Sequence, residues 1–147
     1  MQLSAPDRRT HPGSIVVAAS LLCLATASCA TTGGLKSEPL EAGTSQTYSA
    51  PLNRVVSAAR EAVSQAGFQI DDVVHPNDST WMVIGKRGAS FFSYGELVRA
   101  VVQPAAGGQT VVRIVTRRRL ATDITAKGDY SHAILSSIAA IVLTSER

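Results

Sequence analysis

The pattern of apolar and polar residues changes along the chain. An apolar run, IVVAASLLCLATA, occupies residues 15–27, and residues 30–47 contain no apolar period. From residue 51 onward, apolar residues recur at two spacings, which are the periods of an amphipathic helix and of a half-buried strand. The chain therefore divides into an N-terminal segment, a connecting segment and one folded body.

Two segments of the body have the helical period. Pro51 suits a first helical turn, where its missing N–H is not needed, and Gly67 suits a C-terminal stop. The sequence therefore predicts amphipathic helices over residues 51–66 and 131–143. Their apolar stripes consist of Leu52, Val55, Val56, Ala59, Val63 and Ala66 in the first, and Ile134, Leu135, Ile138, Ile141 and Val142 in the second.

The segments between these helices have the composition of strands. Four strands are predicted, at residues 68–74, 80–86, 97–103 and 110–118. Strands joined by hairpins form an antiparallel meander, and two amphipathic helices need an apolar surface to cover. We therefore predict an α+β fold, a two-layer sandwich with an antiparallel four-stranded sheet and both helices on one face. An extended entry before the first helix would add a fifth strand.

The first 28 residues have the layout of an export signal. Arg8 and Arg9 precede the apolar run, whose thirteen residues are fewer than the roughly 20 that a membrane-spanning helix needs. A basic start, a short apolar middle and small residues after it are typical of a secretory signal peptide. A twin-arginine signal also begins with two arginines, but residues 10–12, THP, do not continue that pattern.

The end of the apolar run separates two kinds of signal. Residues 25–27, ATA, suit an ordinary cleavage site, whereas residues 26–29, TASC, resemble the lipobox of bacterial lipoproteins, with threonine where leucine is usual. The resemblance implies that the chain is cut between Ser28 and Cys29, that the Cys29 thiol receives a diacylglycerol, and that the new amino group is acylated. Two or more acyl chains make a lasting membrane anchor.

The cysteine count and the residue after Cys29 extend this prediction. The two cysteines are Cys23, inside the apolar run, and Cys29, so an unlipidated mature chain would carry one unpaired thiol in an oxidising compartment. Ala30 follows Cys29, and in Gram-negative lipoproteins a residue other than aspartate at this position implies export to the outer membrane. The alternative is a soluble secreted protein that is cut after Ala27.

The sequence predicts three regions. We expect a signal peptide at residues 1–28, a lipidated flexible tether at residues 29–46, and a single α+β domain at residues 47–147. In the order of its elements and in the helix end Ala66-Gly67-Phe68, the body resembles small bacterial envelope lipoproteins that pair a lipobox with one α/β domain. A more distant likeness is to the domains of accessory lipoproteins in outer-membrane protein assembly.

Positive charge gathers on one predicted strand. If Val112, Ile114 and Thr116 face the helices, the other face of the sheet carries four arginines: Arg99, Arg113, Arg117 and Arg119. Such a stripe would suit lipid phosphates, acidic glycans or an acidic partner protein. The alternative is a solvated face whose charges discourage strand pairing between molecules.

The overall charge does not indicate a nucleic-acid partner. The formal net charge is +3 at pH 7, and the loss of residues 1–28, which hold two arginines and one aspartate, would leave +2. An export signal also separates the protein from nucleic acid, and no aromatic residues alternate with these arginines.

The candidate catalytic and metal-binding patterns are weak. His75 lies near Asp71 and Asp72, but no second histidine or cysteine stands at ligand spacing. Residues 129–132, DYSH, contain the residue types of a catalytic triad, yet helix capping explains Asp129 and Ser131 better.

Two further motifs have simpler explanations. Residues 85–88, GKRG, lack the spacing of a phosphate-binding loop. The aromatic residues Trp81, Phe91, Phe92 and Tyr94 are expected to fill the core of a body that has few aromatics.

Together, these features predict a lipid-anchored envelope protein that faces the periplasm and has no catalytic activity and no cofactor. We expect its domain to bind other envelope components or to support their assembly. The alternative is a membrane-tethered periplasmic enzyme or small-ligand-binding protein, which would need a deep apolar pocket near Trp81 and Phe92.

Overall fold

The computed structural model describes residues 30–88, 95–120 and 128–145, so Ser28, Cys29, Phe91, Phe92 and Tyr94 lie outside the described residues. Its elements are, in chain order, α1 (Thr32–Ser37), β1 (Thr44–Tyr48), α2 (Leu52–Gln65), β2 (Gln69–Asn77), β3 (Thr80–Arg87), β4 (Glu96–Pro104), a short 3-10 turn (Ala106–Gly108), β5 (Thr110–Arg118) and α3 (Ser131–Thr144). This order confirms the predicted α+β class.

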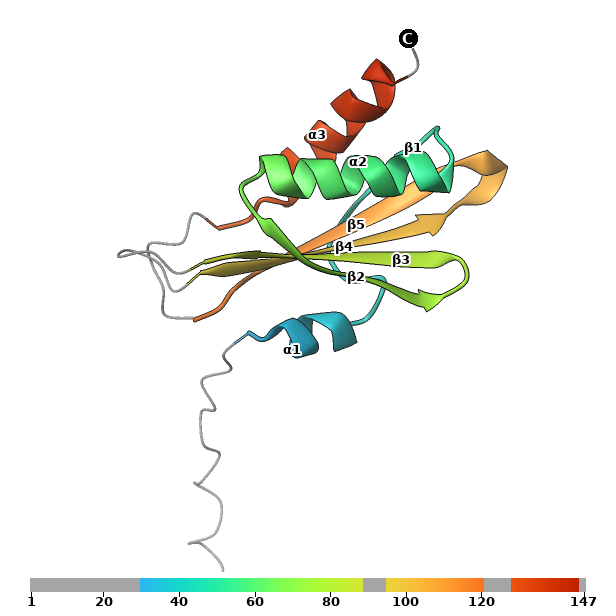
Figure 1. Ribbon diagram of the computed structural model, residues 1–147. Helices are drawn as coiled ribbons and strands as arrows, with labels where there is room; N and C mark the ends of the chain where they lie inside the picture. The colour runs from blue at the N-terminus through green and yellow to red at the C-terminus, as the bar shows by residue number, and fades with distance from the viewer. Residues whose placement is uncertain (1–29, 89–94, 121–127, 146–147) are drawn as a thin grey trace, which may run out of the picture.

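One antiparallel sheet forms the middle of the molecule, with the strand order β1-β5-β4-β3-β2 (Figure 1). Strands β2 to β5 form the predicted meander, in which each strand pairs with its neighbour in sequence. The extended entry before α2 is the fifth strand, because β1 pairs with β5 at the far edge. Helix α2 then crosses the sheet and leads the chain to the opposite edge, where β2 lies.

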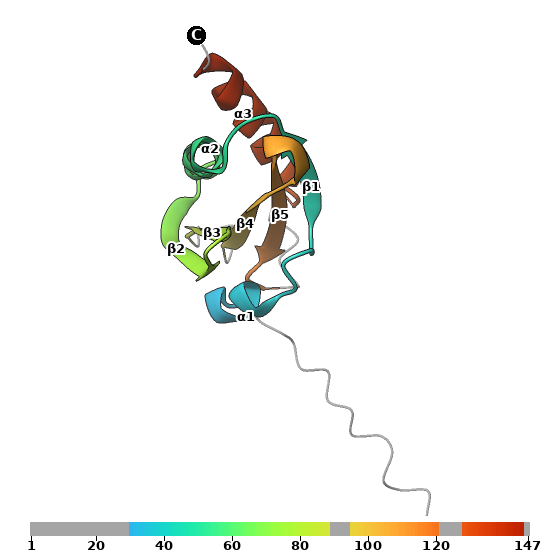
Figure 2. The same ribbon diagram turned by 90° about the vertical axis from the view of Figure 1, so that its right-hand side faces the viewer.

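Helices α2 and α3 cover one face of this sheet, as predicted (Figure 2). Val55, Ala59 and Val63 of α2 have no exposed surface, and they pack with inward-facing residues of β4 and β5. The buried Tyr48 hydroxyl donates a hydrogen bond to the carbonyl oxygen of Leu135 at 2.8 Å, and burial raises the Tyr48 pKa. Strand β1 is thereby tied to α3.

A glycine lets α2 approach β3 closely. A Cβ atom built on Gly85 would lie 2.7 Å from a methyl group of Val63 and 2.8 Å from one of Val98. These distances are shorter than ordinary contacts between carbon atoms. Gly85 therefore allows α2 to pack closely against β3. It is the first residue of the GKRG stretch, and residues 85–87 of that stretch belong to β3 and not to a loop.

The other face of the sheet is also covered, which the prediction of two layers missed. Helix α1 and the residues after it lie under this face (Figure 2). Leu35 packs with Leu97 and Val115, and Leu40 packs against a second small cluster. The prediction of a flexible tether is therefore wrong for residues 30–46, because these side chains and several polar contacts fix the segment to the sheet. Within the described ranges, no helix is long and apolar enough to cross a membrane.

Candidate functional site

The segment that follows Cys29 is fastened to the body from its first described residue. The Ala30 N–H donates to the carbonyl oxygen of Arg119 at 3.1 Å. Helix α1 then begins with Thr31 as its N-cap, whose hydroxyl accepts from the Gly34 N–H at 3.0 Å. Leu35 is only 2 % exposed. We call residues 30–42 the docked segment.

A buried arginine holds the end of α1. Arg99, in the middle of β4, has no exposed surface, and its guanidinium donates to three backbone carbonyl oxygens: those of Leu35 at 3.0 Å, Glu38 at 2.7 Å and Pro39 at 2.9 Å. The last carbonyls of a helix lack partners within the helix and carry a partial negative charge. Arg99 therefore acts as a C-terminal cap supplied by the sheet.

The charge of Arg99 persists despite its burial. Burial lowers the pKa of the guanidinium and the nearby Glu38 carboxylate raises it, but an arginine keeps its proton in a protein. The prediction that Arg99 belongs to an exposed stripe is therefore wrong. Its side chain does lie on the expected face, but the docked segment covers that face.

Two exposed ion pairs also hold the docked segment on the sheet. Arg117 makes a two-pronged contact with Glu38, with N–O distances of 3.0 and 2.9 Å. Lys36 lies 2.6 Å from the Asp72 carboxylate, and its hydrogen bond lowers the pKa of Asp72. These pairs are exposed to water, so they contribute less to stability than the buried contacts of Arg99.

The remaining predicted arginines do not form a continuous stripe. Arg113 is half-buried and donates to the Gln103 side-chain oxygen at 3.0 Å. Arg117 is exposed but paired with Glu38, and Arg119 is exposed just beyond the end of β5. Arg113 thus lies apart from the arginines at the end of the strand.

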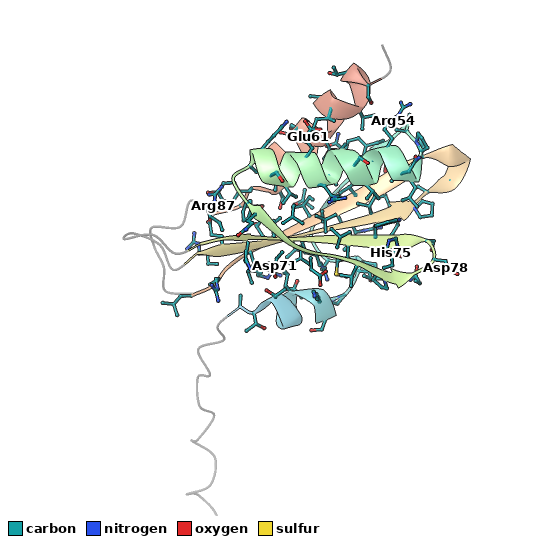
Figure 3. All side chains as sticks on the ribbon, in the orientation of Figure 1. Arg54, Glu61, Asp71, His75, Asp78 and Arg87 are labelled. Atoms are coloured by element: carbon teal, nitrogen blue, oxygen red, sulfur yellow. The ribbon has the colours of Figure 1, made fainter. Side chains whose placement is uncertain are left out.

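Cations instead gather at one end of the sheet, where β3 and β5 finish and β4 begins. The strand register places Lys86 and Arg117 on either side of Leu97, and Arg87 and Arg118 on either side of Glu96. In the view of Figure 3, Arg87 and Asp71 mark this end, and Asp78 marks the opposite one. We call this surface the basic end, and it consists of Lys86, Arg87, Arg117, Arg118 and Arg119.

Arg87 has a structural task at this end. Its guanidinium lies over the rings of Phe68 and Tyr130, 4.7 and 4.6 Å from their centres, and the two rings contact each other edge to face. It donates to Glu96 at 3.2 Å, to the Tyr130 hydroxyl at 2.7 Å and to the carbonyl oxygen of Ala66. Arg87 therefore joins the end of α2 to β4 and to the start of α3.

A polar cavity of about 360 Å³ lies beside the basic end, between the start of β1 and the start of α3. Asp129 lines it and accepts hydrogen bonds from the Ser131 N–H at 2.8 Å and the Thr116 hydroxyl at 3.0 Å. The Ser131 side chain first, then the Ser131 N–H and the Thr116 hydroxyl, lower the pKa of Asp129, and burial opposes them. Ser131 is 3 % exposed and donates to the Ile114 carbonyl oxygen, so it is not placed as a nucleophile. Tyr130 stands at the N-cap position of α3 and makes no side-chain capping bond, while Asp129 before it accepts from the Ser131 N–H in the first turn.

The hydrogen bonds that Asp129 accepts at the start of α3 give a pH-dependent prediction. Asp129→Ala is expected to lower the free energy of unfolding by about 1 kcal/mol at pH 7, the usual net contribution of an intramolecular hydrogen bond. Because its pKa is lower in the folded state, the carboxylate stabilises the fold above the unfolded pKa of about 3.9 and loses this effect as the pH falls further. Urea unfolding at pH 7 and pH 3 should therefore show a difference from wild type that shrinks at pH 3.

The matched control for this prediction is Asp78→Ala, in the exposed turn between β2 and β3. It should change the unfolding free energy little at either pH. A pH-independent loss in Asp129→Ala would show that the carboxylate charge is not what stabilises α3.

The structure does not bring the predicted metal-binding residues together. Asp71 pairs with Lys86 and Asp72 with Lys36, while His75 packs against the Trp81 ring. Across the described residues, no group of three or more histidine, cysteine, aspartate and glutamate side chains is placed to hold a metal ion.

Sequence reasoning missed the docked segment and the cluster around Arg87. Leu35 and Leu40 are isolated apolar residues in a polar stretch, so they give no period. Comparison with models of known protein families and with curated proteins finds no match to this chain.

Proposed function

We propose that this protein is a lipid-anchored component of the bacterial cell envelope. Cys29 carries the acyl chains, the chain is cut after Ser28, and the body faces the periplasm from the outer membrane. The observation that carries the proposal is the position of Cys29. It ends a lipobox-like sequence and stands directly before Ala30, where the described contacts of the fold begin.

The same proposal assigns the body a non-catalytic role, in which it binds other envelope components or supports their assembly. The polar clusters of the described residues are occupied with internal bonds. Asp129 accepts from the first turn of α3, Arg87 links α2 to α3, and Arg99 fastens the docked segment. The second half of α3, by contrast, presents apolar surface, since the Leu143 side chain is 66 % exposed. Leu143 is the exposed large apolar residue of the described ranges, and we assign this end of α3 to contact with a partner.

The anchor is tested by intact mass. Protein purified from membranes of its native host is expected to begin at Cys29 and to be heavier by a diacylglycerol and an acyl chain. Cys29→Ala should lack this added mass, because no other residue at that position can form the thioether. The matched control is Cys23→Ala, inside the signal, which should be lipidated like the wild type. An unmodified chain that begins at Ser28 in the soluble fraction would contradict the proposal.

A further inference from the structure

Because the docked segment is fixed to the sheet, almost no free chain separates a lipid on Cys29 from the body. If residues 30–46 formed a free tether, its root-mean-square length would be about 23 Å. The Ala30 N–H is instead bonded to Arg119, whose own N–H donates to the Gly95 carbonyl oxygen at 3.0 Å. A lipid-bearing Cys29 would therefore stand one peptide unit, about 3.8 Å between Cα atoms, from a fixed point of the fold.

The contacts that fix this point are strong enough to hold it under thermal motion. The Arg99 guanidinium donates to three carbonyl oxygens at the end of α1, and Leu35 is buried between the helix and the sheet. The exposed ion pair between Arg117 and Glu38 adds a further contact between the docked segment and β5. Releasing the segment would expose Leu35 to water and remove the three carbonyl partners of Arg99.

The fixed point lies at the basic end. Ala30 contacts Arg119, and α1 begins at the same end of the sheet as Arg87 in Figures 1 and 3. The opposite end carries the turn between β2 and β3, with Asp78. Strand β3 connects the two, and Trp81 and Arg87 lie about 20 Å apart along it at the usual rise per residue.

We propose that the anchored protein stands with its basic end on the bilayer. The exposed Arg119 then faces the phosphate groups of anionic phospholipids in the leaflet that holds the anchor, and the turn at Asp78 points into the periplasm. This inference rests on the proposed function, because it needs the lipid on Cys29. We favour phospholipid as the partner for two reasons. A body attached one residue away from its acyl chains lies next to the lipid headgroups, and the negative charge of anionic headgroups attracts arginine.

The single tryptophan offers a direct test of this orientation. The lipidated protein is placed in vesicles of phosphatidylethanolamine and phosphatidylglycerol that contain a dansyl-headgroup lipid, and energy transfer from Trp81 is measured. The matched variant combines Trp81→Phe with Gly33→Trp, which moves the donor to α1. Gly33 is exposed and nothing lies within 4 Å of a Cβ atom built on it, so the fold accommodates the change.

We expect transfer from position 33 to exceed transfer from position 81 several-fold. Equal transfer from the two positions would mean that the body moves freely on a slack tether, and stronger transfer from position 81 would mean the opposite orientation. Either result overturns the inference. The proposed function fails separately, in the mass spectrum of the same sample, if the acyl groups are missing from Cys29.

The phospholipid contact is tested with charge variants. Arg119→Gln is expected to reduce the difference in transfer between the two positions, and so is replacement of phosphatidylglycerol by phosphatidylcholine. Arg60→Gln, on the exposed side of α2, should leave the difference unchanged. If Arg119→Gln behaves like wild type in both kinds of vesicle, the contact with anionic headgroups is overturned.

Discussion

Arg87→Met is expected to lower the free energy of unfolding by about 3–5 kcal/mol, the range found when one partner of a buried ion pair is removed. Glu96 is only 4 % exposed, and Arg87 lies 3.2 Å from its carboxylate. The other carboxylate oxygen of Glu96 is buried without a hydrogen-bond partner, so Arg87 supplies its main compensation. Without Arg87, the carboxylate must stay buried and uncompensated or draw water into the core.

Two further losses add to this effect. The guanidinium donates to the carbonyl oxygens of Ala66 and Gly67, where α2 ends and the chain turns toward β2. It also lies over the rings of both Phe68 and Tyr130, which attract a cation electrostatically. Methionine keeps an apolar stem of similar length, so the change removes the charge and its hydrogen bonds more than the packing.

The measurement is urea unfolding of the mature chain at pH 7. The double variant Arg87→Met with Glu96→Gln should recover part of the lost stability, because a neutral amide costs less to bury than a carboxylate. Arg60→Met, on the exposed side of α2, serves as the control and should change little. A loss below about 1 kcal/mol in Arg87→Met would show that Glu96 does not depend on this partner.

The elements of the fold could be predicted because their signals are local. The valine-rich strand predicted at residues 97–103 is β4, Glu96–Pro104, and the helix predicted at residues 51–66 is α2, Leu52–Gln65. Each follows from a period of apolar residues and from the turn residues beside it. The fifth strand is predicted only as an extended entry before α2, since Thr44–Tyr48 is too polar to indicate a strand without its partner β5.

The sequence of β4 contains a signal that the second face of the sheet is also covered. In β4, Leu97 and Val101 flank Arg99 on one face, while Val98, Ala100 and Val102 fill the other. A strand with apolar residues on both faces is typical of a sheet that is covered on both sides. The run of apolar residues around Arg99 therefore indicated a third layer, and an arginine within it indicated a partner rich in hydrogen-bond acceptors.

The cluster around Arg87 could not be predicted in the same way. Its partners come from the end of α2, the start of β4 and the residue before α3, and the sequence separates them widely. In the sequence, Arg87 is one of several basic residues near a glycine. Only the sheet register, which places Arg87 beside Glu96, distinguishes it from the exposed cations around it.

Arg99→Met is expected to release the docked segment and leave the sheet folded. The variant removes three hydrogen bonds from a charged donor to the carbonyl oxygens of Leu35, Glu38 and Pro39. Each bond of this kind contributes about 1.5–3 kcal/mol, and carbonyls left buried without partners carry a comparable penalty. These carbonyls regain water only if the segment leaves the sheet, so undocking is the favourable response.

Trypsin cleavage after Lys36 measures this release, because the protease needs the segment in an open, extended form. If the variant lowers the docking free energy by about 3 kcal/mol, the open population rises about a hundredfold, and so does the cleavage rate while opening and closing stay fast. The matched control is Arg117→Met, which breaks the exposed pair with Glu38 and should accelerate cleavage less than about fivefold. Equal acceleration in the two variants would contradict a special role for Arg99.

The same variant separates the anchor from the orientation that it imposes. Lipidation of Cys29 depends on the signal and precedes docking, so Arg99→Met should acquire the same acyl mass as the wild type. Its body would nevertheless be joined to the anchor by a segment of about 17 free residues, with a root-mean-square length of about 23 Å. Energy transfer from positions 33 and 81 should then differ less than in the wild type. Unchanged transfer together with rapid cleavage at Lys36 would mean that contacts other than the docked segment hold the body on the membrane.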